Sequence, residues 1–123
     1  MYRYFTRTEL QCRCGCGLER MDRDFMRKLE AMREAASFPF IVTSAYRCPE
    51  HNARVSSTGR AGPHTTGRAI DIAAQGERAL WLVANAPRFG FTGIGVSQKG
   101  SGRFIHLDDL QAPDFPRPNI WSY

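Results

Sequence analysis

Apolar residues recur with the period of an α-helix in the segment that follows Asp22. Phe25, Met26, Leu29 and Met32 fall on one face of such a helix, and charged residues fill the other face. Asp22 can cap the first turn with its carboxylate. The pattern therefore predicts an amphipathic helix of about fourteen residues, which is an ordinary length in a globular domain.

Two further segments have the pattern of β-strands. Residues 40–43 are apolar and partly β-branched, as in a buried strand. Residues 69–73, AIDIA, alternate so that Ile70 and Ile72 point to one side and Asp71 points to the other. A carboxylate between small apolar neighbours on a strand needs a partner or water, and a metal ion would be one such partner.

The second half of the chain predicts one more helix and a hairpin. Residues 75–88 fit a helix with Leu80 and Leu82 in its buried stripe, closed by a proline and a glycine. Residues 91–96 and 103–107 read as two strands separated by a polar turn, and we expect them to pair.

These elements predict one small domain that contains both helices and strands. The chain has 123 residues, 42% of them hydrophobic, which fits a single folded domain over residues 1–123. Residues 1–20 form a lead-in that contains three cysteines. Residues 109–123 contain three prolines and are expected to be an extended tail on the surface.

Charge and hydropathy narrow the partners and the location. There are 17 basic and 12 acidic residues, a net charge of +5. This favours a solvated arginine-rich surface, and the alternative is attraction to a polyanion such as nucleic acid or an anionic cell wall. Basic runs with interleaved aromatics are missing, so we expect no specific nucleic-acid binding. Without a long apolar run or a signal-peptide pattern, we expect synthesis in the cytoplasm, no membrane insertion and a monomer.

The four cysteines leave two interpretations open. Cys12, Cys14 and Cys16 lie in one tract, QCRCGCG, and Cys48 lies far downstream. The tract lacks the usual C-x2-C pair of zinc sites, which favours ordinary thiols in a tight glycine-bearing turn. The alternative is a structural zinc held by these three thiols and Cys48. A disulfide framework is not expected in a chain without a secretory signal.

Three residues suggest a metal site of the catalytic type. His64 precedes the AIDIA strand that carries Asp71, and His106 lies on the last predicted strand. Two imidazoles and a carboxylate can hold Zn²⁺ and leave one position open for water. The alternative is a loop histidine, a hydrogen-bonded core carboxylate and a strand histidine with no metal. Spacing alone does not separate the two interpretations.

Four segments carry a resemblance to a known family. TSAYRCPEHN, PHTTGRAIDI, GIGV and FIHLDD follow one another in this order. They resemble the M15 zinc peptidases, the group of D-alanyl-D-alanine carboxypeptidases, phage endolysins and murein endopeptidases. The likeness runs from about residue 21 to residue 108, and QCRCGCG resembles small phage-encoded members. The likeness implies a small α+β domain, with an antiparallel sheet and flanking helices that carry a zinc site. It also implies a zinc peptidase that cuts peptidoglycan stem or cross-link peptides and acts on the cell wall or in the periplasm.

The resemblance also implies roles for individual residues. It makes His64, Asp71 and His106 the zinc ligands. It makes Arg47 a catalytic and substrate-binding residue that meets a carboxylate or carbonyl of the peptide, a task that suits the forked guanidinium donors. It further implies that Ser44 and Tyr46 shape the substrate cleft.

The sequence departs from the family at the position of the general base. Many relatives carry an acidic residue three positions before the last ligand histidine or a histidine two positions before it, and here these are Arg103 and Phe104. Asp108 is the candidate base, because it shares the strand face of His106. The alternative is that Asp108 only supports the ligand. Relatives often carry a small hydroxyl residue two positions before the first ligand histidine. Here that residue is Gly62, so the substrate contact that the hydroxyl makes in relatives is not expected.

The missing base keeps a second class of function open. A non-catalytic, zinc-containing module could bind cell-wall peptide, for example as a structural part of a phage particle. A basic nucleic-acid-binding protein is the third and weakest hypothesis.

Overall fold

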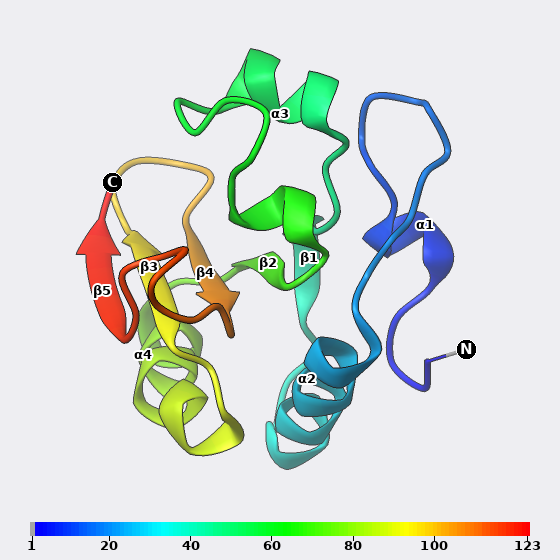
Figure 1. The fold of residues 1–123 in the computed structure, drawn as a ribbon. Helices are drawn as coiled ribbons and strands as arrows, with labels where there is room; N and C mark the ends of the chain where they lie inside the picture. Colours follow the sequence, from blue (N-terminus) through cyan, green and yellow to red (C-terminus); the bar gives the residue numbers. More distant parts are fainter. Residues whose placement is uncertain (1) are drawn as a thin grey trace.

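A five-stranded sheet organises the chain in the computed structural model, which describes residues 2–123 (Figure 1). The spatial order is β1-β2-β4-β3-β5, and the first four strands in this order pair antiparallel. The strands are β1 (Ile41–Ser44), β2 (Ala69–Ala73), β3 (Gly93–Ser97), β4 (Phe104–Asp108) and β5 (Asn119–Ser122). The expected α+β class is confirmed, and β3 and β4 form the expected hairpin.

The fifth strand makes the sheet mixed. β5 runs parallel to β3, with Ile94 opposite Ile120 and Gly95 opposite Trp121. The sequence predicted only an extended surface tail over residues 109–123. The strand escaped prediction because four residues between prolines and the chain end show no clear alternation, and because its partner is a distant edge strand rather than a neighbour in sequence.

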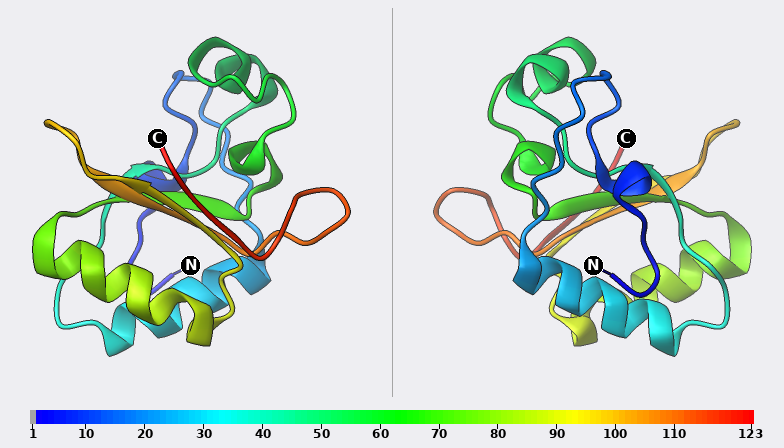
Figure 2. Two further views of the ribbon diagram at one scale, coloured as in Figure 1. Left: turned by 90° about the vertical axis from the view of Figure 1, so that its left-hand side faces the viewer. Right: turned by 90° about the vertical axis from the view of Figure 1, so that its right-hand side faces the viewer.

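Two helices cover one face of the sheet, whereas the short helices over residues 49–55 and 63–66 lie on its other side (Figure 2). The covering helices are α2 (Arg23–Ala35) and α4 (Gly76–Asn85). The remaining helices are α1 (Arg7–Leu10), α3 (Pro49–Val55) and the 3-10 turns η1 (Pro63–Thr66) and η2 (Ala86–Phe89). As predicted, the Asp22 side chain caps α2 by accepting the backbone N–H of Phe25 at 3.0 Å. Among residues 2–123, no helix is both long enough and apolar enough to cross a membrane.

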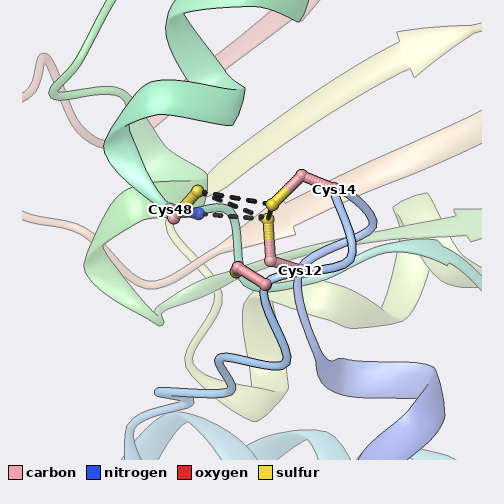
Figure 3. A group of neighbouring side chains, drawn as sticks. Cys12, Cys14 and Cys48 are labelled. Carbon is pink, nitrogen blue, oxygen red and sulfur yellow. Dashed lines mark hydrogen bonds between the residues drawn. The ribbon is translucent and has the colours of Figure 1, made fainter.

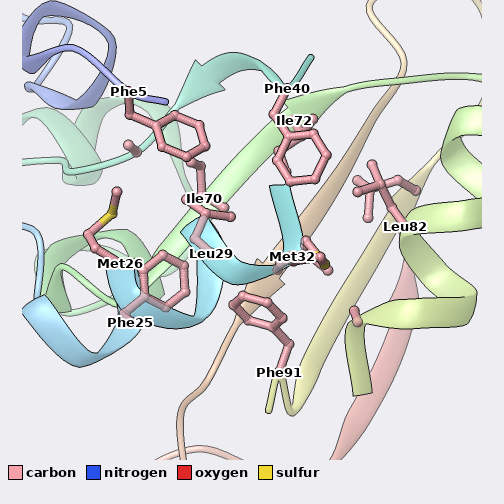
Figure 4. Packing of buried hydrophobic residues seen from close by; sticks show 14 of the residues in the cluster. Phe5, Phe25, Met26, Leu29, Met32, Phe40, Ile70, Ile72, Leu82 and Phe91 are labelled. Atoms are coloured by element: carbon pink, nitrogen blue, oxygen red, sulfur yellow. The ribbon is translucent and has the colours of Figure 1, made fainter. Parts of the chain in front are cut away.

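The core lies between α2, α4 and the sheet face beneath them (Figure 4). α2 buries the stripe predicted from its sequence, and β2 and β4 contribute alternate side chains against it. The central members are Phe25, Met26, Leu29, Met32, Ile70, Ile72, Ile105 and Leu107. Phe5 and Leu10 anchor the lead-in to the same core. Because alternate strand residues face opposite ways, burial of the isoleucines in β2 turns Asp71 to the other face.

The buried stripe of α4 differs from the prediction. Leu82 is fully buried, but Leu80 is 69% exposed, and Ala79 and Ala86 take the inward positions. Residues 79, 82 and 86 follow the helical period, and residue 80 lies about 100° around the helix from residue 79. The large apolar side chains suggested the stripe in the sequence, whereas two alanines complete it in the structure.

Candidate metal centre

The two central strands bring Asp71 and His106 together. β2 and β4 pair so that Asp71 stands directly opposite His106 on the sheet face that α2 and α4 leave uncovered. Asp71 Oδ1 lies 3.0 Å from His106 Nδ1. The pairing follows from strand alternation, because any register that buries Ile70 and Ile72 must also turn Asp71 outward.

η1 delivers the third residue of the group. His64 Nε2 lies 3.2 Å from Asp71 Oδ1, and the rings of His64 and His106 are 5.2 Å apart. All three side chains are buried, at 5%, 6% and 2% exposure for His64, Asp71 and His106. The structure therefore assembles the three residues that the sequence predicted, with Asp71 between the two imidazoles.

The outer nitrogen of each imidazole is already engaged. His64 Nδ1 lies 2.7 Å from the backbone carbonyl of Ala45, and His106 Nε2 lies 2.7 Å from Asp108 Oδ2. If these nitrogens carry the protons, the unprotonated nitrogens of both rings face Asp71, which is the arrangement that metal-binding histidines need. Ligands around a tetrahedral zinc are separated by about 3.3 Å, close to the spacings of this group. The donor set and its geometry fit a zinc ion.

The electrostatics of the group suit a cation. Burial by itself would raise the pKa of Asp71, but hydrogen bonds to His106 and His64 outweigh it and lower that pKa below its usual range. Burial by itself would lower the pKa of His106, but hydrogen bonds to Asp108 and Asp71 outweigh it and raise that pKa. The site thus holds an ionised carboxylate beside an imidazole whose affinity for a proton is raised, and a metal cation would compete with that proton for the ring nitrogen that faces Asp71.

Asp108 lies behind His106 and is enclosed by donors. Its side chain is 0% exposed. Its carboxylate accepts hydrogen bonds from Nε and Nη2 of Arg117, at 2.8 Å each, and also contacts Nε2 of His106. The backbone N–H of Leu110 donates to its Oδ1 at 3.3 Å. Although burial would raise the pKa of Asp108, Arg117 and His106 bring it down to about 2. This enclosure favours the supporting role over the role of general base.

Arg117 is a contributor that the sequence analysis missed. It lies in the segment expected to be a surface tail, yet its side chain is only 4% exposed and its guanidinium forms a forked pair with Asp108. A forked arginine–carboxylate pair fixes both the position and the charge state of the carboxylate. No local pattern marks this residue, because its role depends on β5 returning the tail to the sheet.

A cavity of about 610 Å³ opens next to the three residues, and Arg47 lies in its wall. Arg47 donates Nε to Ser44 Oγ at 3.1 Å and Nη1 to Asn52 Oδ1 at 3.0 Å. Its Nη2 is 3.7 Å from Asp71 Oδ2. Ser44 and Asn52 therefore hold the guanidinium at the edge of the cavity, and Ser44 contacts Arg47 without lining the cavity itself. Asn52 was not identified from the sequence.

Tyr46 does not line the cavity. It is 5% exposed and belongs to the hydrophobic core, and its backbone N–H donates to the carbonyl of Leu10 at 3.1 Å. Tyr46 therefore lies away from the cleft that it was expected to shape. Its backbone instead ties the lead-in to the segment that carries Arg47.

Another part of the cavity wall is aromatic and consists of Phe104 in β4, Trp121 in β5 and Tyr123, which follows β5. Trp121 packs its ring 5.2 Å from that of His106, and Tyr123 and Phe104 are 5.1 Å apart. A Cβ on Gly95 would come within 2.7 Å of the Trp121 indole nitrogen, so this packing needs a glycine in β3. The glycines of GIGV were expected to allow close backbone approach, but the aromatic residues that use the space were not predicted.

The comparison with protein families agrees with this site. A family model described as Peptidase M15 matches residues 3–108. The matched range contains the three candidate ligands and ends at Asp108, so Arg117 and Trp121 lie beyond it. No curated protein matches the chain.

Proposed function

The chain belongs to the M15 peptidase family, and we propose that it is a zinc-dependent peptidase that hydrolyses stem or cross-link peptides of peptidoglycan. The observation that carries the proposal is the convergence of His64 and His106 on Asp71 Oδ1, at 3.2 and 3.0 Å, beside a cavity. A zinc ion held by these residues would lower the pKa of a water molecule and polarise a peptide carbonyl.

The residues around the ligands have complementary tasks. The Ala45 carbonyl orients His64, and Asp108 orients His106, so that each ring presents a fixed nitrogen. Arg117 keeps Asp108 ionised and in place. Preorganised ligands of this kind raise metal affinity, because little order has to be gained on binding.

Arg47 and the aromatic wall suit a peptide that carries carboxylates. The side chain of Arg47 is 17% exposed, and Ser44 and Asn52 fix it at the cavity. A fixed guanidinium can bind a peptide carboxylate through two parallel hydrogen bonds and so orient the scissile bond. Trp121 offers an apolar surface against which the substrate backbone can lie. The net charge of +5 would favour approach to an anionic cell wall.

One observation favours a second candidate function. Within the described residues, Asp71 is the only carboxylate that lines the cavity, and Asp108 is enclosed behind His106. A peptidase needs a group that takes a proton from water, and without such a group the site could bind metal and peptide without cutting. The second candidate is therefore a metal-containing module that binds cell-wall peptide.

The metal is tested by the zinc content of His106→Ala beside the wild type. His51→Ala is the matched control, because this third histidine lies on α3 outside the group. We expect His106→Ala to lose one equivalent of zinc and His51→Ala to lose none. If the wild type holds no zinc at the His64–Asp71–His106 group after zinc is added back, the proposal fails.

The activity is tested by peptide release from purified peptidoglycan, followed by mass spectrometry of the products. We expect the wild type to release peptides, a chelator to stop the release, and zinc to restore it. The mass of the products identifies the bond that is cut. Zinc-dependent binding to peptidoglycan without any release would refute the peptidase and support the binding module.

A further inference from the structure

A second group of potential metal ligands lies away from the cavity. Cys12, Cys14 and Cys16 in the lead-in converge with Cys48, which immediately precedes α3, and their four sulfurs all lie within 4.8 Å of one another. Cys12 Sγ is 3.5 Å from Cys14 Sγ and 3.7 Å from Cys48 Sγ, and the Cys14–Cys48 distance is also 3.7 Å (Figure 3). Residues 36 positions apart in sequence thus share one cluster.

The distances discriminate between a disulfide and a metal site. Bonded sulfurs lie about 2.05 Å apart, and all four cysteines are free. Four thiolates around zinc, at about 2.3 Å from the ion, lie about 3.8 Å from one another. The separations of 3.5 to 3.7 Å among three of the sulfurs match one face of such a tetrahedron.

The local backbone explains how an unusual spacing produces this cluster. Gly15 has φ 91°, a left-handed conformation that turns the chain between Cys14 and Cys16. The backbone N–H of Cys12 donates to the carbonyl of Leu18 at 2.8 Å and closes the loop. The backbone N–H of Cys48 donates to Cys12 Sγ at 3.3 Å, which favours a thiolate at that sulfur. The turn therefore gathers thiols that lack the C-x2-C spacing.

We propose that Cys12, Cys14, Cys16 and Cys48 bind a structural zinc ion. The sequence favoured ordinary thiols, and the three-dimensional arrangement reverses that preference. Four protein ligands would complete the coordination of the ion and leave no position for water, so this centre is structural, unlike the three-ligand centre at the cavity. The proposal is independent of the proposed peptidase function.

The location of the cluster indicates what the zinc stabilises. Cys48 directly follows Arg47, and the backbone N–H of Arg47 donates to the carbonyl of His64 at 3.2 Å. His64 in turn is held by the Ala45 carbonyl at 2.7 Å. A zinc that ties the lead-in to Cys48 therefore fixes the segment that positions both the candidate substrate-binding arginine and one ligand of the cavity centre.

The test is the zinc stoichiometry of protein purified under reducing conditions. We expect two zinc ions per chain in the wild type, one in the double variant Cys14→Ser/Cys16→Ser, and one in His106→Ala. The double variant is preferred because both side chains are exposed, so their replacement leaves the core intact. After substitution with cobalt, we expect a thiolate-to-cobalt charge-transfer band in the wild type and in His106→Ala, and its loss in the double variant.

Thiol reactivity gives a second readout that needs no variant. In the native zinc-loaded protein, we expect the four thiols to resist alkylation until a strong chelator is added. Full alkylation of the zinc-loaded protein, absence of the charge-transfer band, or an intramolecular disulfide detected by mass would each overturn the proposal. Loss of zinc from the cavity centre alone would contradict the peptidase and leave this site standing.

Discussion

Replacement of Asp108 by asparagine separates the two roles that the sequence left open for this residue. The change removes the charge and turns one acceptor oxygen into a donor amide, with almost no change in volume. The Asp108 carboxylate accepts a hydrogen bond from His106 Nε2 at 2.7 Å and two hydrogen bonds from Arg117 nitrogens at 2.8 Å each. An asparagine cannot satisfy all of these donors with its single oxygen.

The size of the effect on zinc binding follows from the hydrogen-bonding conflict that Asp108→Asn creates at His106. If the new oxygen stays with Arg117, the amide N–H₂ faces His106 Nε2, and the proton of the ring is driven to Nδ1. That nitrogen faces Asp71 and is the one available to a metal. Loss of the partner that orients a ligand histidine weakens metal binding by about 10–100-fold, which is about 1.4–2.7 kcal/mol. We therefore expect the zinc dissociation constant of the cavity centre to rise by that factor in Asp108→Asn.

The assay is competition for zinc against a chromogenic chelator at fixed pH, combined with peptide release at saturating zinc. Asp109→Asn is a matched control, because Asp109 is the neighbouring residue and its side chain is also 0% exposed. Its carboxylate binds Arg68 and Lys28 and does not contact His106. We expect both variants to be less stable, since each weakens a buried ion pair, but only Asp108→Asn to bind zinc more weakly.

A different pattern would refute this reasoning. If Asp108→Asn binds zinc as tightly as the wild type but loses peptide release even at saturating zinc, Asp108 is the proton acceptor of the reaction. Equal loss of zinc affinity in the Asp109→Asn control would show instead that the effect comes from general destabilisation.

Three further predictions concern the cavity, the pH dependence and the core. Arg47→Lys should keep its zinc but lose about 10–100-fold in kcat/KM for peptide release, because the forked donors are lost; an unchanged kcat/KM would argue against a substrate contact. The pKa of Asp108 is about 2 in the folded state, below the value near 3.8 of a free carboxyl, so its contribution to stability is present above about pH 4 and is lost as the pH falls towards 2. Acid titration of the metal-free protein, followed by circular dichroism, should show a loss on the order of 2 kcal/mol in the free energy of unfolding, and this loss should be absent in Asp108→Asn. Identical titrations of the two proteins would contradict the prediction. Leu82→Ala should lower the free energy of unfolding by about 2–5 kcal/mol and Leu80→Ala by no more than about 0.5 kcal/mol; similar losses in urea titrations would mean that α4 is rotated relative to the structure.

Local patterns in the sequence were sufficient for most of the scaffold. The periodicity of Phe25, Leu29 and Met32 predicted α2 and its buried face, and the alternation in AIDIA predicted both a strand and the direction of Asp71. These features depend on residues two to four positions apart, and the conformation of each segment is enough to express them. The same local reasoning failed at Leu80, because two small alanines outweighed a large apolar side chain in setting the buried face of α4.

The sequence by itself determined the chemical types at the cavity and the family, because His64, Asp71 and His106 lie in motifs that can be read without a structure. Only the tertiary structure decided what surrounds them. β5 returns Arg117 to Asp108 and Trp121 to His106, and the turn at Gly15 brings three thiols to Cys48. Such contacts depend on which sheet edge and which surface remain open after the rest of the chain has packed, and no short-range pattern contains that information.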